Sequence, residues 1–227
     1  MASPDYTGIA ARVLESLGMA VARKSFQLVP VSDGPCELAQ REFAVLDIET
    51  TGGKPEDERI IEIAALVLKD GAIVRSFSQL VDPERHIPPF ITKLTGINSE
   101  MVSSRPHIGE VLPRFLDFAA DAVMVAHHSD FDIGFITASA KRIGLEFGNE
   151  VLCTRKLGKY ILPWLPSHSL STIADFFGID IRNRHRALGD AEATTKILDI
   201  FLRYVQRRGL KTFNELKQLE RGQFQLF

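Results

Sequence analysis

The sequence predicts an α/β fold, with a mixed five-stranded sheet and helices on both of its faces. The chain has 227 residues, 45% of them hydrophobic and 25% charged, which is enough to bury one sizeable core. Between residues 43 and 81, three short apolar runs follow one another with a turn signal before the third. Further along, short apolar runs alternate with helical stretches, a pattern typical of crossover connections between parallel strands.

The first three strands are expected close together in the sequence. They are "FAVLDIE" from Phe43, "RIIEIAALVLKDG" from Arg59 and "AIVRSFSQLV" from Ala72. Asp70 and Gly71 separate the last two, and an Asp-Gly pair between two strands favours a tight hairpin. We therefore expect the second and third strands to be antiparallel neighbours.

The remaining elements follow from apolar runs and helical spacing. Two more strands are expected, "AVMVAH" at 122–127 and "EVLCT" at 150–154. The segment 88–120 is expected to be mostly helical, and further helices are expected at about 131–143, 154–162, 170–177 and 187–207. Residues 1–40 are an N-terminal extension of unknown role, in which a helical pattern precedes a partly alternating one.

Composition and charge narrow the class of protein. The net charge is −2 and the pI is about 6.3, so the overall charge gives no indication of a nucleic-acid partner. A polyanion would have to be held locally or through metal ions. Cys36 and Cys153 stand far apart without a metal-ligand spacing, which argues against a zinc site and favours a reducing compartment. No segment nears the length that spans a bilayer, so we expect a cytoplasmic location and no membrane partner.

The stretch "VLDIETTG" ends a buried strand with two carboxylates. Residues i and i+2 of a strand point to the same face, so Asp47 and Glu49 are expected to project together, away from the core face. Two like charges side by side repel each other, and a divalent cation with oxygen ligands would turn that repulsion into a binding site. The alternative is a solvated strand end.

Two further acids follow in distinctive settings. Asp132 lies at the start of a helix just past an apolar strand, and Asp190 lies within the first turn or so of the long helix. Ligand sites in open α/β sheets gather at the carboxyl ends of strands, where these segments and Asp47 would meet. Taken singly, each acid is explained as a charge that complements a helix N-terminus. Taken together with Glu49, they favour a two-cation site.

Three motifs in order, "DIETTG", "AHHSDFD" and "HRALGD", resemble those of the DEDDh family of 3′-to-5′ exonucleases, and most closely the epsilon-type proofreading subunits of bacterial DNA polymerase III. The likeness covers roughly residues 42–205 and includes "LTGINSEMVSSRP", similar to the segment that walls the terminal-nucleotide pocket. The resemblance implies an RNase H-like fold. We accordingly divide the chain into the extension 1–40, an exonuclease domain at 41–210 and a C-terminal tail at 211–227.

The resemblance also implies roles for the acids and for one histidine. The catalytic acids would bind two divalent cations, Mg²⁺ or Mn²⁺; they are Asp47, Glu49, Asp132 and Asp190. His185, five residues before Asp190, would be the h-type histidine and the general base that takes the proton from the attacking water. The tyrosine of the other branch of the family is absent here, since its place is taken by an arginine.

Four residues are expected to contact or support the 3′-terminal nucleotide. By resemblance, Thr51 and Gly52 would approach a terminal sugar through exposed backbone N–H groups and a flexible glycine. Ile97 would lie against the terminal base, although it is also explained as an ordinary core residue. Phe131 is expected to pack under the site, because it flanks Asp132 on an apolar helix face.

One residue departs from the middle motif of the family, which usually has Asn where this chain has His128. A neutral histidine donates one hydrogen bond and accepts another, so it replaces an amide only in part. We expect lower activity or a different pH optimum. His127 and His128 are otherwise interpreted as turn residues.

The function that the resemblance implies is metal-dependent hydrolysis at single-stranded or frayed DNA 3′ ends, with release of nucleoside monophosphates, in proofreading or repair. A DNA polymerase would be a partner. Two alternatives stay open. One is RNA 3′-end trimming, because nothing in the motifs shows how a 2′-hydroxyl is treated. The other is a nucleic-acid end-binding module, catalytically weakened by the departure at His128.

The C-terminus, Gln223 to Phe227, resembles the Gln-x-x-Leu-Phe peptides that dock on bacterial sliding clamps. Two large apolar side chains at a free end are typical of a docking peptide. The alternative is that Leu226 and Phe227 fold back on the core of the chain. The tail thus predicts a sliding clamp as a second partner.

Overall fold

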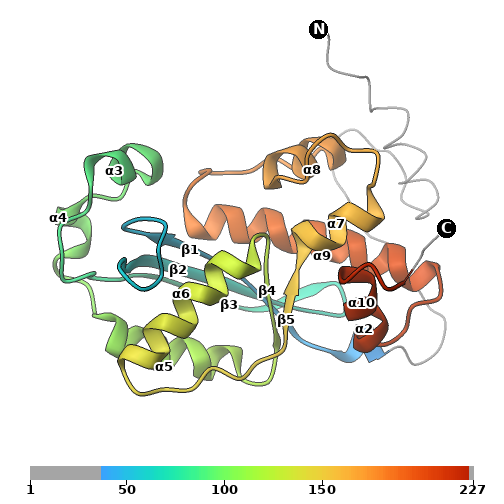
Figure 1. Ribbon diagram of the computed structural model, residues 1–227, viewed down its shortest axis with the longest axis horizontal. Coiled ribbons are helices and arrows are strands. Elements are labelled where there is room, and N and C mark those ends of the chain that lie inside the picture. The colour runs from blue at the N-terminus through green and yellow to red at the C-terminus, as the bar shows by residue number, and fades with distance from the viewer. Residues whose placement is uncertain (1–36, 225–227) are drawn as a thin grey trace, which may run out of the picture.

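The structure, a computed structural model, describes residues 37–224, and its core is a five-stranded mixed sheet (Figure 1). The strands are β1 (Phe43–Thr50), β2 (Ile60–Lys69), β3 (Ala72–Leu80), β4 (Val123–Ala126) and β5 (Val151–Cys153). They lie in the order β3-β2-β1-β4-β5. The pairs β1-β2 and β2-β3 are antiparallel, whereas β1-β4 and β4-β5 are parallel. The predicted mixed sheet is confirmed.

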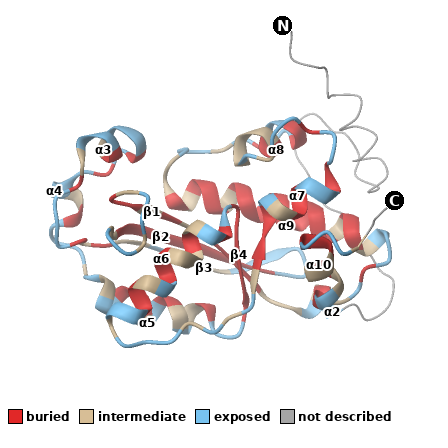
Figure 2. Ribbon diagram, in the orientation of Figure 1, coloured by how far each residue is buried: buried red, intermediate tan, exposed pale blue. Residues whose placement is uncertain are grey.

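Helices cover both faces of this sheet (Figure 1). In chain order they are α2 (Glu37–Gln40), α3 (Pro89–Thr95), α4 (Ser99–Val102), α5 (Ile108–Ala119), α6 (Ser129–Arg142), α7 (Thr154–Ile161), α8 (Leu170–Phe177), α9 (Ala187–Arg207) and α10 (Phe213–Glu220). Helices α5 and α6 pack on one face, and α7, α8, α9 and α10 pack on the other. Buried residues run along the middle of the sheet and the inner side of α9 (Figure 2).

The two faces of β1 belong to two different cores, as the alternation of a strand requires. Phe43 and Val45 pack with α7, α8 and α9, while Ala44 and Leu46 pack with α5 and α6. The crossover helices α5 and α6 therefore lie together on one side of the central strand, and the helices that follow β5 lie on the other side. This arrangement leaves the carboxyl end of β1 between the start of α6 and the start of α9.

The predicted elements agree with the structure except at the two ends of the described residues, where α2 and a helix near the C-terminus were not predicted. Helix α9 has the expected bounds, and α6 begins two residues before its expected start. The expected tail contains a further helix, α10, which begins with a capping box of Thr212 and Glu215. Leu216 and Leu219 bury this helix in the core shared with α9. The Thr-x-x-Glu spacing was the sequence signal for it, and the division of the chain at residue 210 stays a prediction.

Some expectations fall outside the described residues. They concern the helix and strand patterns before residue 37, Cys36, and the last two apolar residues, Leu226 and Phe227. Between residues 37 and 224, no helix combines the length and the apolar character needed to cross a bilayer. The expected cytoplasmic location stays a prediction.

Candidate active site

The carboxyl end of β1 carries two carboxylates on the face that α9 covers. Asp47 and Glu49 share that face with Val45, which packs in the core on the α9 side. Leu46 and Ile48 point the other way, into the core beneath α5 and α6. Both acids are half-buried at the edge of the core. Strand alternation therefore brings the two carboxylates together, as the sequence predicts.

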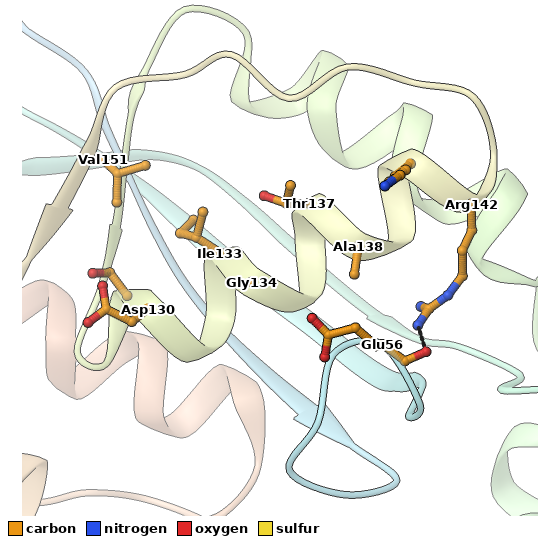
Figure 3. A pocket seen from close by; sticks show the side chains of 10 residues that line it. Glu56, Asp130, Ile133, Gly134, Thr137, Ala138, Arg142 and Val151 are labelled. Carbon is orange, nitrogen blue, oxygen red and sulfur yellow. Dashed lines mark hydrogen bonds between the residues drawn. The ribbon is translucent and has the colours of Figure 1, made fainter.

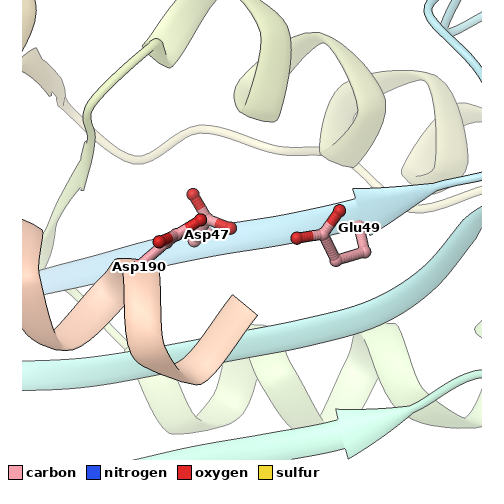
Figure 4. Close-up of side chains that lie close together, drawn as sticks. All are labelled: Asp47, Glu49 and Asp190. Carbon is pink, nitrogen blue, oxygen red and sulfur yellow. The ribbon is translucent and has the colours of Figure 1, made fainter. Parts of the chain in front are cut away.

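The first turn of α9 brings a third carboxylate to the same place. Carboxylate oxygens of Asp47, Glu49 and Asp190 lie within 4.8 Å of one another (Figure 4). The Oδ2 atom of Asp190 accepts the backbone N–H of His185 at 3.2 Å. Its Oδ1 atom is buried and has no hydrogen-bond partner among residues 37–224. A buried carboxylate oxygen without a donor fits the role of a cation ligand.

The fourth predicted acid, Asp132, lies beside this group but not within it. It occupies the first turn of α6, directly after β4, and is 4% exposed. The backbone N–H groups of Asp132 and Ile48 lie close enough to its carboxylate to favour the charged form, which lowers its pKa, although burial raises the pKa by more. Its charge raises the pKa of Asp47, so the two carboxylates are electrostatic neighbours. Three of the four acids therefore form one tight group, and the fourth, Asp132, lies close enough to Asp47 to raise its pKa.

Burial raises the pKa of all four acids. The pKa of Asp47 lies well above its usual range, first because the group is buried and then because Asp132 and Asp190 repel its charge. For Glu49, burial followed by repulsion from Asp190 raises the pKa to about 8. Burial raises the pKa of Asp132 to about 7, and it also raises the pKa of Asp190. Deprotonating the cluster is costly without a cation, and its oxygen donors are those that Mg²⁺ and Mn²⁺ prefer.

His185 lies in the loop just before α9. Its φ of 62° is in the left-handed region, which residues other than glycine rarely occupy. The bond from its N–H to Asp190 ties this loop to the acid cluster, and the residue is half-buried. His185 and Asp190 are therefore neighbours in space as well as in sequence.

Thr51 and Gly52 follow β1 and are fixed by the next segment of chain. The N–H of Thr51 donates to the carbonyl of Arg59 at 2.8 Å, and its hydroxyl donates to Glu58. A Cβ at position 52 would lie 2.8 Å from the Glu58 side chain, so a larger residue would displace the glutamate that binds the Thr51 hydroxyl. One detail of the prediction is wrong: the Thr51 amide is not exposed toward a substrate, because Arg59 already binds it.

The other predicted contact residues differ in how much surface they offer. Ile97 is fully buried in a small cluster with Ile61 and Ile91, so its contact with a base stays a prediction. Phe131 packs against the core on the α6 side, with its ring 4.9 Å from that of Phe135. His128 is exposed and stacks on Phe131, with ring centroids 6.2 Å apart and planes 9° apart.

The neighbouring histidine, His127, has a structural role that the sequence did not reveal. It is 8% exposed, with Nδ1 2.9 Å from the hydroxyl of Thr154 and Nε2 3.0 Å from the carbonyl of His168. Burial lowers the pKa of His127 to about 4, so its imidazole is neutral near pH 7. His127 thus links the end of β4 to α7 and to the segment before α8.

A residue missed in the sequence, Glu62, completes the surroundings of the site. It lies on β2 directly opposite Glu49 and is only 3% exposed. Its carboxylate accepts three hydrogen bonds: from Nε of Arg186 at 3.1 Å, from Nη2 of Arg186 at 2.7 Å and from the backbone N–H of Ala187 at 3.0 Å. The signal in the sequence was one acid inside the long apolar run "IIEIAALVL".

A surface pocket of about 850 Å³ lies along α6 (Figure 3). Glu56, Asp130, Gly134 and Arg142 are among the residues that line it. Arg142 donates to the carbonyls of Pro55 and Glu56, so it ties the segment after β1 to α6. None of the four predicted acids lines this pocket, and it is separate from the candidate active site.

The fold and the acid cluster together define an α/β protein with a carboxylate-rich site at the carboxyl end of its central strand. The exonuclease family profile, RNase_T, matches residues 44–198. The chain therefore belongs to the exonuclease family, and its membership confirms the predicted resemblance.

Two curated relatives illustrate the range of the family. A PolC-type DNA polymerase III from Caldanaerobacter subterraneus subsp. tengcongensis is 42% identical over 192 residues, which is 84% of this chain and 14% of that protein. The chain thus spans about one seventh of that relative. A DNA polymerase III subunit epsilon from Aquifex aeolicus is 40% identical over 187 residues, 80% of this chain and 91% of that protein.

Solved structures agree with the fold. Exonuclease X, determined in complex with 5′ overhanging duplex DNA, superposes with a TM-score of 0.60 at 27% identity. The match covers 78% of this chain and 99% of that one. The five-stranded sheet with helices on both faces is thus the fold of known exonucleases.

Proposed function

We propose that this protein is a metal-dependent 3′-to-5′ exonuclease that hydrolyses phosphodiester bonds at single-stranded or frayed DNA 3′ ends and releases nucleoside monophosphates. The observation that carries the proposal is the group of Asp47, Glu49 and Asp190 within 4.8 Å, with His185 bonded to the last of them. Membership of the exonuclease family supports the reaction class, and the exonuclease X structure with duplex DNA supports DNA as substrate.

The acids would hold two divalent cations, Mg²⁺ or Mn²⁺. The unpartnered Oδ1 of Asp190 and the raised pKa values of the cluster support cation binding, because both follow from buried carboxylates without enough donors. Asp47, Glu49 and Asp190 would be the ligands of the tight group, and Asp132 would contribute from beside Asp47. Such ions supply Lewis acidity and make water a better nucleophile near pH 7.

The residues of the chain would bind the strand end and move one proton. His185 would accept the proton of the attacking water, a role that suits a histidine whose backbone is bonded to Asp190 and whose charge lowers the pKa of that acid. Thr51 and Gly52 would form the wall next to the terminal nucleotide, with Ile97 beneath it. Phe131, which packs on the core from α6, would support this wall.

The relatives suggest the setting in which the activity is used. Both curated relatives named above are DNA polymerase III proteins, which supports a DNA polymerase as partner and a proofreading or repair role. Chain ends that fray from a template would then be the natural substrate.

The C-terminal peptide would add a second partner, the sliding clamp. Gly222 has a φ of 73° and ends the chain segment after α10, while Phe224 packs partly on the core beside α9. Phe224 occupies a variable place of the Gln-x-x-Leu-Phe pattern, and the N–H of Gln223 donates to the carbonyl of Gln218 at 2.8 Å. Gln223 would have to leave this position to bind a clamp. A weak contact of this kind raises the local concentration of a nuclease at DNA ends. Deleting residues 223–227 should abolish clamp binding and leave digestion of free oligomers unchanged.

Matched oligomers would test the proposed activity. DNA and RNA strands of one sequence, labelled at the 3′ or the 5′ end, are incubated with Mg²⁺ or Mn²⁺ and then with EDTA. We expect early loss of the 3′ label from DNA as mononucleotide, a ladder from the 5′ label, and no reaction with EDTA. Faster digestion of RNA would indicate 3′-end trimming instead. Binding of ends without cleavage would indicate the weakened end-binding module.

A further inference from the structure

Helix α9 begins without a capping side chain of its own. Arg186 occupies its N-cap position and makes no side-chain cap bond, although N-cap residues usually accept a backbone N–H. The missing acceptor comes from β2, where the Glu62 carboxylate accepts the N–H of Ala187 at 3.0 Å. The positive end of the helix dipole also favours a carboxylate there. The sheet therefore caps the helix that carries Asp190.

The same carboxylate holds the side chain of the N-cap residue. Glu62 accepts Nε and Nη2 of Arg186 in a two-pronged pair, the geometry that a planar guanidinium makes with a carboxylate. Glu62 is 3% exposed, so its charge needs this partner. The pair fixes both the helix start and the residue that follows His185.

The loop before α9 has little freedom of its own. Asn183 and His185 both have positive φ values, 51° and 62°, which cost energy unless the surroundings enforce them. The N–H of Arg186 donates to the carbonyl of Asn183, which closes the turn. At Gly189, an added Cβ would lie 1.9 Å from the carbonyl of Arg182, so the loop passes directly against the first turn of the helix.

From these contacts we infer that Glu62 and Arg186 are positioning residues, and that their ion pair holds the 182–186 loop so that His185 faces the acid cluster. The inference rests on the proposed function, because it takes His185 as the base. Two anchors flank this histidine: its own N–H is bonded to Asp190, and the next residue is bonded to Glu62. Releasing the second anchor would let the strained loop relax and move the imidazole from its place.

The test compares Arg186→Leu with a matched arginine elsewhere. The Arg75 side chain is also 36% exposed and also lies 2.7 Å from a glutamate, Glu42, but at the far end of β1. Hydrogen exchange of residues 182–190 is measured without metal, and kcat and KM are measured on a single-stranded DNA oligomer with Mg²⁺. We expect exchange about tenfold faster and kcat about tenfold lower in Arg186→Leu, with KM within about twofold. Arg75→Leu should leave all three values unchanged.

Two further variants keep the test informative. Arg186→Lys keeps the positive charge but cannot form the two-pronged pair with Glu62, so its kcat should lie between those of Arg186→Leu and the unmodified protein. The double variant Glu62→Gln with Arg186→Met leaves no buried unpaired charge, so it should fold and still show fast exchange in residues 182–190. Failure of Arg186→Lys to recover any kcat would count against a positioning role for the pair.

Several results would overturn the inference. Unchanged exchange in Arg186→Leu would show that the pair does not hold the loop, and faster exchange with unchanged kcat would show that the loop does not position a base. A higher KM at constant kcat would make Arg186 a substrate contact. If the unmodified protein cuts no nucleic acid, the proposed function fails, while the exchange measurement still decides whether the pair holds the loop.

Discussion

Glu49 and Glu62 are paired across the β1-β2 ladder, yet the surroundings stabilise the charge of Glu62 and repel that of Glu49. Glu62 is satisfied by the protein, through the fork of Arg186 and the N–H of Ala187. Glu49 has acidic neighbours, and burial and repulsion raise its pKa to about 8. Both are glutamates at the same height of the sheet. The comparison leads us to expect that a functional acid is recognised by missing partners rather than by burial or residue type.

The same contrast applies within Asp190. Its Oδ2 atom accepts a backbone N–H and holds the loop, while its Oδ1 atom is buried without a partner. One oxygen thus has a structural task, and the other is left for a ligand. The following predictions test whether the unsatisfied groups are the ones on which function depends.

The largest effect is expected from removing an unsatisfied acid. Asp47→Ala or Asp190→Ala should reduce cleavage by about a thousandfold or more, because each removes a cation ligand from the site. Without metal, Asp47→Ala should leave the folded state as stable as before or slightly more stable, since a repelling charge is lost. Asp190→Ala also loses the bond from the His185 N–H, which offsets that gain. Single-turnover digestion and thermal unfolding in EDTA measure the two effects. Unchanged turnover in either variant would contradict the assignment of the metal site.

A smaller loss is expected at the base. His185→Ala should slow hydrolysis by about a hundredfold at neutral pH, the usual scale of lost general-base catalysis. Cation affinity, measured by calorimetry with Mn²⁺, should stay within about threefold of the unmodified protein, since the acids are intact. If the variant lost cation binding instead, His185 would be a ligand and not a base.

The pH dependence of stability should reveal the unsatisfied acids as a group. The pKa of Glu49 rises from 4.5 to about 8 and that of Asp132 from 3.8 to about 7, so the folded state holds more protons than the unfolded state between these values. The free energy of unfolding should therefore fall by about 2 kcal/mol or more as pH rises from about 4 to 8 without metal. Added Mg²⁺ should flatten the curve. Denaturant titrations in EDTA and in Mg²⁺ measure both, and rising stability over this range would contradict the prediction.

Neutralising each of the two opposed glutamates tests the comparison most directly. At pH 8 without metal, Glu49→Gln should raise the free energy of unfolding by about 1 kcal/mol, because it removes a repelled charge. Glu62→Gln should lower it by about 1–3 kcal/mol, because Arg186 loses its charged partner. Urea unfolding of both variants gives the two signs. If both variants changed the free energy of unfolding in the same direction, the surroundings of Glu49 and Glu62 would not differ as described.

How far the site could be predicted depended on whether its cause was local. Strand alternation placed Asp47 and Glu49 on one face, and helical spacing gave the start of α9 and hence the place of Asp190. Glu62 was missed because its partner Arg186 is 124 residues away, and only tertiary packing brings them together. The bonded amide of Thr51 was missed because its acceptor, the carbonyl of Arg59, is brought to it by the turn that joins β1 to β2.

The smallest effect is expected at the residue that departs from the family motif. His128 is exposed, it precedes α6, and its ring stacks on Phe131 without a side-chain cap bond to the helix. An asparagine is a better N-cap than a histidine, because its side-chain oxygen accepts an N–H of the first turn. His128→Asn should therefore steady the turn that carries Asp132 and leave kcat equal or up to about threefold higher. The rate of digestion of single-stranded DNA across pH 6 to 9 measures this change in kcat. His127→Asn is the contrasting variant: His127 is buried between two hydrogen-bond partners, so its loss should destabilise the fold. A large loss of activity in His128→Asn would show that the exposed imidazole has a task of its own, and that a group can be functional here without being an unsatisfied acid.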